Sequence, residues 1–286
     1  MRIWQADFYR RPLQDEAGKP LWELLICDSA RSFEFSAFCS QGDANSTWLA
    51  HQLQQQIQLK NKPDRIQVFR PQSLSLIEAA GKVLGIKVEA TRHTPALKLL
   101  LQERAKAYAS MPNYTGESYS PIAIESPPPV PLPENIWGDR WRFASLVAGD
   151  IEDAFKGRPL PILEMPESLL PLNLGLASTV PVPGVIIDGG RQSMRLARWL
   201  QDAKPVALNY IAGAPDGLIL EAGLADRFVV ATFEDSDVKA AAQIYMQRQQ
   251  LSKGLHFLLV QPDDTGMTYT GFWLLNFKQL TVDSHH

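Results

Sequence analysis

The chain has 286 residues with a hydrophobic content of 45%, which fits about two globular domains with buried cores. No uninterrupted apolar run approaches the ~20 residues that a membrane-spanning helix needs, and no apolar segment precedes the first acid, Asp7, so the sequence predicts a cytoplasmic protein without a membrane span. Cys27 and Cys39 are too few for a disulfide framework or a cysteine-only zinc site, and their apolar surroundings predict buried free thiols.

Charge is divided unevenly along the chain, although the net charge is only −3. Residues 1–112 contain 15 basic against 11 acidic side chains, and residues 113–286 contain 13 against 20, which together make the 28 and 31 of the whole chain. The mildly basic first part permits nucleic-acid binding. A protein that coats nucleic acid without selectivity is usually far more basic, so that class is disfavoured.

Eight secondary-structure elements are predicted in residues 1–112. Strands are expected at 2–9, 21–27, 33–39, 64–69 and 86–90, and helices at 46–59, 73–84 and 94–110. Gly85 ends the second helix, and Pro95 lies in the first turn of the third. Three leading strands followed by alternating helices and strands suggest a ribonuclease-H-like order.

A metal-dependent nuclease of that fold would need several carboxylates on its strands and first helix. Asp7 and Asp28 lie on or beside leading strands, but the helix at 46–59 and the strand at 65–69 contain no acid. The expected metal ligands are therefore missing, and Asp28 is better explained as a turn residue before Ser29. We expect no metal and no other cofactor.

The most basic stretch of the first part surrounds the third helix. Arg92 and His93 precede the helix N-terminus, where free N–H groups and the helix dipole favour an anion. Lys98 and Arg104 follow within the helix. The stretch is either a phosphate-binding site or an ordinary solvated helix.

The segment from Glu125 to Glu134 contains five prolines within seven residues. Proline fixes φ and removes a backbone donor, so neither a helix nor a central strand can continue here, and an extended spacer is expected. With the polar run before it, this segment divides the chain into a first domain (1–112), a linker (113–135) and a second domain (136–280). We therefore predict an α/β protein with two mixed-sheet domains.

Two tryptophans and two arginines follow the spacer within residues 137–142. Trp137 and Arg140 could stack on bases and contact phosphates. Trp141 alternates with Arg140 and Arg142, as in a half-buried strand with the tryptophan facing the core.

The rest of the second domain is again mixed α/β. Further strands are expected from 184, at 205–211, 217–222, 227–233, 255–261 and 269–277, with helices at 193–201 and 236–253. The acidic trio Asp150, Glu152 and Asp153 lacks the spacing of a calcium loop and predicts a solvated surface. His256 lies in an apolar strand and is expected to fill the core.

Several short segments, in the same order along the chain, resemble one family. They are Leu21–Leu24 with Cys27-Asp28, Phe69–Gln72, Thr91–Leu97 with Glu103-Arg104 and Met111–Tyr114, Leu132-Pro133 with Trp137–Asp139 and Trp141, and Gly271–Leu275. Together these segments resemble the TAB/ATAB-type proteins of cyanobacteria and chloroplasts, over almost the whole chain.

The resemblance implies a non-enzymatic RNA-binding protein that prefers A/U-rich single-stranded mRNA leaders and supports translation or biogenesis of photosystem reaction-centre proteins, with translation or assembly partners. It ties the Trp-Leu-Leu tripeptide to function, and the sequence leaves open whether these residues form a binding surface or pack in the core. The residues predicted to bind RNA are Arg70, Arg92, His93, Lys98, Arg104, Trp137, Arg140, Trp273, Leu274 and Leu275. Two alternatives stay open: a nuclease-like enzyme using Asp7, Asp28 or Asp188, and a scaffold that binds no RNA.

Overall fold

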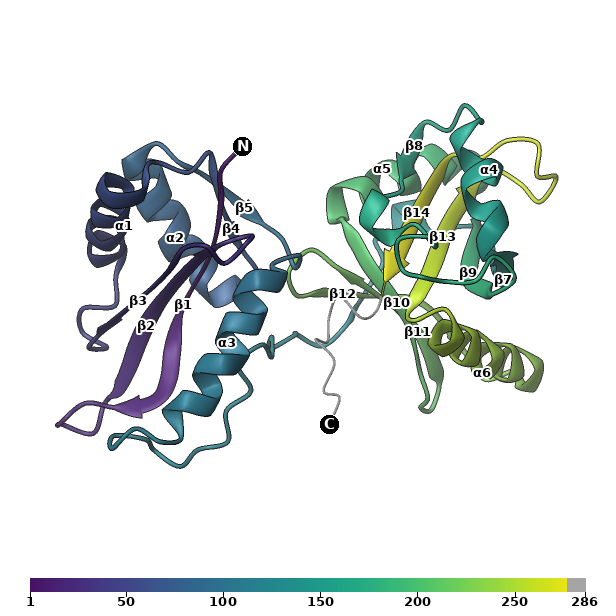
Figure 1. Ribbon diagram of the computed structural model, residues 1–286. Helices are drawn as coiled ribbons and strands as arrows, with labels where there is room; N and C mark the ends of the chain where they lie inside the picture. The colour runs from purple at the N-terminus through teal and green to yellow at the C-terminus, as the bar shows by residue number, and fades with distance from the viewer. Residues whose placement is uncertain (277–286) are drawn as a thin grey trace. The chain divides into compact units, whose positions relative to one another are not determined.

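The computed structural model describes residues 1–276, and the chain forms two compact units, Met1–Glu125 and Ser126–His286 (Figure 1). Both units combine helices with a mixed sheet, which confirms the predicted α/β class. The predicted domain end at residue 280 and the last residue of the final predicted strand, Phe277, lie outside the described residues. Within residues 1–276, no helix is long and apolar enough to cross a bilayer.

The first unit is built on a five-stranded sheet with the order β3-β2-β1-β4-β5. Its strands are β1 (Ile3–Gln14), β2 (Pro20–Asp28), β3 (Glu34–Cys39), β4 (Arg65–Val68) and β5 (Lys87–Ala90). The first three strands are antiparallel, and β4 and β5 run parallel to β1. The predicted element order is confirmed. The first strand is longer than expected because it continues, after a register shift, to pair Gln14 with Pro20.

Three helices cover this sheet: α1 (Ser46–Lys60), α2 (Pro71–Leu84) and α3 (Pro95–Tyr108). Successive side chains of a strand point to opposite faces. In β2, Leu24 and Ile26 join the cluster formed with α1 and α2, whereas Leu25 and Cys27 join the cluster formed with α3. The sheet therefore lies between two helical layers, and Cys27 is a buried free thiol as predicted.

Two sheets form the second unit. One has the order β7-β9-β13-β14-β8 and the other β10-β11-β12-β6. The strands are β6 (Val130–Pro131), β7 (Arg140–Val147), β8 (Ile162–Glu164), β9 (Pro181–Asp188), β10 (Pro205–Ile211), β11 (Asp216–Ala222), β12 (Asp226–Phe233), β13 (Leu255–Gln261) and β14 (Gly271–Asn276). The helices are α4 (Ile151–Lys156), α5 (Ser193–Ala203) and α6 (Ser236–Leu251).

The segment predicted as a linker makes specific contacts at both of its ends. Tyr114 bridges Leu13, and the Thr115 N–H donates to the Pro12 carbonyl, so this part lies against the first unit. Val130–Pro131 instead pairs with β12 in the second unit. The proline there is tolerated because β6 is an edge strand, where one donor is not needed. The segment is thus not a free spacer over its whole length.

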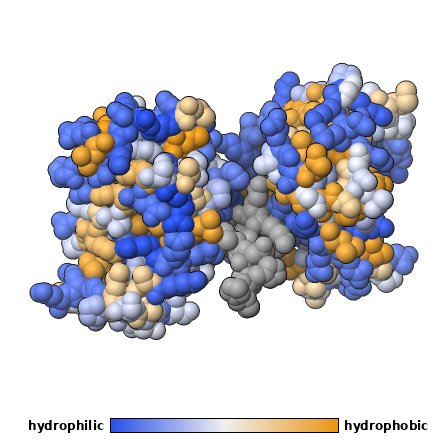
Figure 2. All heavy atoms as spheres, viewed as in Figure 1, coloured by the Kyte–Doolittle hydropathy of each residue, from blue (hydrophilic) through white to orange (hydrophobic). Residues whose placement is uncertain are grey.

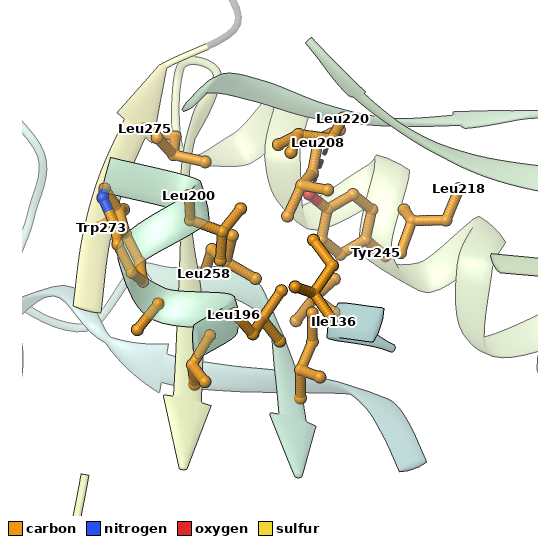
Figure 3. Packing of buried hydrophobic residues seen from close by; sticks show 14 of the residues in the cluster. Ile136, Leu196, Leu200, Leu208, Leu218, Leu220, Tyr245, Leu258, Trp273 and Leu275 are labelled. Carbon is orange, nitrogen blue, oxygen red and sulfur yellow. Dashed lines mark hydrogen bonds between the residues drawn. The ribbon is translucent and has the colours of Figure 1, made fainter. Parts of the chain in front are cut away.

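The larger hydrophobic core of the second unit lies between its two sheets and helices α5 and α6 (Figure 3). Leu196 and Leu200 of α5 pack towards Trp273 of β14, and the Tyr245 hydroxyl donates to the Leu208 carbonyl over 3.1 Å. His256 is fully buried nearby and accepts a hydrogen bond from the Leu208 N–H. Burial lowers the pKa of His256 to about 4, so its ring is neutral and its predicted core role is confirmed.

Candidate nucleic-acid interface

The predicted basic contacts of the first unit lie largely in its interior. Arg70 is only 3% exposed, and Arg92 and Lys98 are also buried. Burial and the neighbouring Arg92 lower the pKa of Lys98 to about 8. His93 lies at the surface just before α3. Of these four residues, only His93 is therefore exposed at the surface.

Arg70 is buried because it neutralises Asp7 and holds a segment of the chain in place. Its Nε donates to the Asp7 carboxylate over 2.9 Å, and its two Nη atoms donate to the carbonyls of Pro121 and Ala123. All three guanidinium nitrogens are thus bonded within the unit. Arg70 is placed here by the carboxylate of Asp7, which lies 63 residues earlier in the chain, so local sequence patterns could not predict the pair.

Arg104 belongs to the same charged network. Its guanidinium pairs with the buried carboxylate of Glu23, which also accepts from Tyr108 and from the Arg11 Nε. Arg11 donates in turn to Asp7 over 3.0 Å. Burial by itself would raise the pKa of Asp7, but the charges of Arg70 and Arg11 outweigh it and hold that pKa below its ordinary value. These arginines therefore compensate buried acids and stabilise the fold.

The Trp-Leu-Leu tripeptide lies inside the second unit. Trp273 is 2% exposed, and Leu274 and Leu275 are buried as well. Trp273 and Leu275 face the larger core, whereas Leu274 faces the other core cluster. The strand is buried on both faces because a hydrophobic cluster packs against each face of the sheet. The three side chains therefore pack in the core, which is one of the two placements that the sequence left open for them.

Trp137 is the predicted aromatic contact that lies at the surface. Its ring is 58% exposed, and its Nε1 donates to the Leu132 carbonyl over 2.9 Å, which fixes the orientation of the ring. Much of the visible surface of both units is hydrophilic (Figure 2), so an exposed indole that is anchored in this way is a candidate for ligand contact.

Trp137 lines a groove of about 540 Å³ in the second unit. The lining residues are Pro131, Leu132, Trp137, Gly138, Arg140, Trp141, Ile187, Leu196, Val229, Val230, Ala231 and Thr232. Arg140 is exposed at this groove, while Trp141 is half-buried and packs against Phe143 and Phe233. The structure thus brings together Trp137 and Arg140 and adds Trp141 to them.

One wall of the groove is an open strand edge. The short β6 pairs with β12 only at Phe228 and Val229. Beyond that point no other strand in the described part of the chain pairs with this side of β12, and Val230–Thr232 line the groove. Within residues 1–276, main-chain groups there that point away from β11 have no partner strand. The groove therefore offers aromatic faces for stacking, main-chain donors and acceptors for a base edge, and a guanidinium for phosphate.

A second cavity of about 500 Å³ lies in the first unit, beside the charged network. Arg11, Arg70 and Tyr119 line it, but the Tyr119 hydroxyl and both guanidiniums already bond to groups of the unit. The cavity has no aromatic face as exposed as that of Trp137. We therefore place the candidate interface in the second unit.

The carboxylates of the nuclease alternative are held by protein donors. Asp28 accepts from the Ser32 backbone and hydroxyl, as a turn residue does. Asp188 accepts from Arg142 over 2.6 Å and from Gln261 over 2.8 Å. Among residues 1–276, no group of three or more His, Cys, Asp or Glu side chains is placed to hold a metal ion. The acidic trio lies around the start of α4 and contributes to no such group.

The groove could be predicted only in part, because it is assembled from distant segments. The clustered tryptophans and arginines of 137–142 indicated that this segment could contact RNA. The pairing of β6 with β12, about a hundred residues later in the chain, leaves no trace in local sequence patterns. Val230–Thr232 and Leu196 were therefore missed.

Comparisons with known proteins match both parts of the chain to one family. Residues 3–104 match the model "RNA-binding protein Tab2/Atab2 N terminal", and residues 119–276 match "RNA-binding protein Tab2/Atab2, C-terminal domain". The chain is 31% identical to "Protein TAB2 homolog, chloroplastic" of Zea mays and 30% identical to the protein of that name from Arabidopsis thaliana. Each comparison spans 96% of this chain, and 71% and 74% of the two relatives.

Both curated relatives are chloroplastic by name, so the prediction of a cytoplasmic protein is wrong on this comparison. A solved structure, the HTLV-2 integrase catalytic core domain in complex with magnesium, matches 38% of this chain and 75% of its own chain, with 16% identity and a TM-score of 0.26. A similarity at that TM-score carries no argument about this protein.

Proposed function

We propose, from the premise that the chain belongs to the Tab2/Atab2 family of RNA-binding proteins, that it binds single-stranded RNA in the groove beside Trp137. The observation that carries this proposal is the exposed, hydrogen-bonded Trp137 ring in a groove that also contains Arg140 and the open edge of β12. Each base has a flat face that can stack on an indole, so an aromatic groove of this kind accepts a single strand.

We propose further that the preferred ligands are A/U-rich mRNA leaders, and that the protein supports translation or biogenesis of photosystem reaction-centre proteins without catalysing a reaction. The support is the family membership and the chloroplastic relatives. The open main chain of Val230–Thr232 offers hydrogen-bonding groups to a base edge, which is how a single-stranded reader can distinguish bases that stack equally well.

Replacing Trp137 by alanine is expected to weaken binding to an A/U-rich single-stranded RNA by about tenfold to a hundredfold, since base–indole stacking contributes about 1–3 kcal/mol. Fluorescence anisotropy with a labelled oligonucleotide measures the affinity. Because the ring is largely exposed, the thermal midpoint of unfolding is expected to change little.

A matched control is Phe38→Ala, which removes an exposed aromatic ring from the first unit. It should leave RNA affinity unchanged. Equal loss of affinity in both variants would contradict a specific role for the groove. Shortening of the RNA in the presence of divalent ions would favour the nuclease alternative, and no RNA binding at low salt would favour a scaffold.

A further inference from the structure

Helix α5 and the turn before it carry three arginines on one side. Arg191, Arg195 and Arg198 are spaced at i, i+4 and i+7, so they project from neighbouring turns of one helical face. All three are exposed. The opposite side of α5 is its buried side and carries Leu196 and Leu200. The arginines therefore form a basic face about 10 Å long.

This basic face compensates no acid in the described part of the second unit. Among residues 1–276, no carboxylate lies within ion-pair distance of these three guanidiniums, although Asp202 follows Arg198 by one turn. By contrast, Arg142 pairs with Asp188, and Arg227 pairs with Glu221. Three exposed positive charges held together, with no counterion from residues 1–276, suit a surface that meets a polyanion.

Helix α5 lies beside the candidate groove through its buried side, and the arginines project from the other side of the same helix. Leu196, between Arg195 and Arg198 in sequence, lines that groove. Helix α5 also contacts the short turn Glu134–Ile136, which immediately precedes Trp137. A strand whose base stacks on Trp137 would therefore have its neighbouring sugar-phosphate groups close to α5.

We infer that Arg191, Arg195 and Arg198 bind consecutive phosphates of the RNA strand whose base occupies the Trp137 groove. This inference rests on the proposed function. It assigns the phosphate contacts to α5 and the turn before it, in the acidic half of the chain. In the basic half, Arg11, Arg70 and Arg104 form ion pairs with Asp7 and Glu23. The helix would position the strand, and the groove would contact the base.

The test is the triple variant R191Q/R195Q/R198Q, measured by anisotropy with an A/U-rich single-stranded RNA across a salt series. The slope of log K against log salt should become less steep by about 2, since each single-strand phosphate contact contributes about 0.7. Affinity at low salt should fall at least tenfold. Substitution on the exposed face of α5 should leave the circular dichroism spectrum unchanged.

The matched control K19Q/K62Q/K82Q removes the same charge from exposed positions of the first unit and should retain the original slope. An unchanged slope in the α5 variant, or an equal change in both variants, would overturn the inference. If W137A still weakens binding in that case, base binding in the groove remains supported, and only phosphate binding by the three arginines is contradicted. If the unaltered protein shows no salt-dependent RNA binding, the proposed function fails as well.

Discussion

Trp273→Ala is expected to lower the free energy of unfolding of the second unit by about 3–5 kcal/mol, the usual range when a large buried aromatic is truncated. The ring lies in the core formed with α5 (Figure 3). It also packs so closely over Gly271 that a Cβ added there would lie 2.5 Å from the indole. Neighbouring side chains cannot fill the space without moving backbone, so a cavity remains. Urea denaturation followed by fluorescence measures the loss.

The more conservative variant Trp273→Phe should lower the free energy of unfolding less, because it fills part of the volume. It also removes an indole N–H for which residues 1–276 provide no hydrogen-bond partner. In both variants the fraction that remains folded should bind RNA with the original affinity. Loss of RNA affinity without loss of stability would contradict a core role and indicate a direct contact by this strand. Trp137→Ala should show the reverse pattern, with affinity reduced and stability retained.

Asp7→Ala is expected to destabilise the first unit by about 3–5 kcal/mol, which is the usual effect of removing one partner from a buried ion pair. The Asp7 carboxylate accepts hydrogen bonds from Arg11, Arg70 and Ser73, and it is completely buried. Without it, two buried guanidiniums lose a counterion. Chemical denaturation of the purified chain gives the difference in unfolding free energy.

A control with the same change of residue type is Asp28→Ala. Asp28 closes a turn near the surface through Ser32, so its loss should cost only about 1 kcal/mol. Similar losses in the two variants would contradict the account of Asp7 as the centre of the charged network. A stable Asp7→Ala variant with reduced RNA affinity would instead indicate that the region around Arg70 binds RNA.

Local patterns in the sequence were sufficient for most of the elements. Gly85 adopts the left-handed conformation that ends α2, Pro95 begins α3, and the Asn45 side chain caps α1 by accepting from the Trp48 N–H. Each of these signals acts within a few residues, so it can be recognised without knowledge of the fold. The alternation of Trp141 with two arginines likewise identified the strand that became β7.

Burial of charged and aromatic residues could not be predicted in the same way. Arginine is usually a surface residue. Arg70 is buried because Asp7 and the carbonyls of Pro121 and Ala123 accept hydrogen bonds from its guanidinium. Trp273 lies in an apolar segment, whereas polar residues surround Trp137 in the sequence. Trp273 is buried and Trp137 is exposed because other elements pack over Trp273 and not over Trp137, which depends on the tertiary fold.

The central claim is that single-stranded RNA lies against the Trp137 groove of the second unit. Photo-crosslinking of the intact protein to an A/U-rich RNA that contains 4-thiouridine, followed by mass spectrometry of the peptides, tests it most directly. We expect crosslinks within residues 132–141 and 229–232, reduced by Trp137→Ala. Crosslinks confined to the first unit, or an undiminished pattern in that variant, would contradict the account.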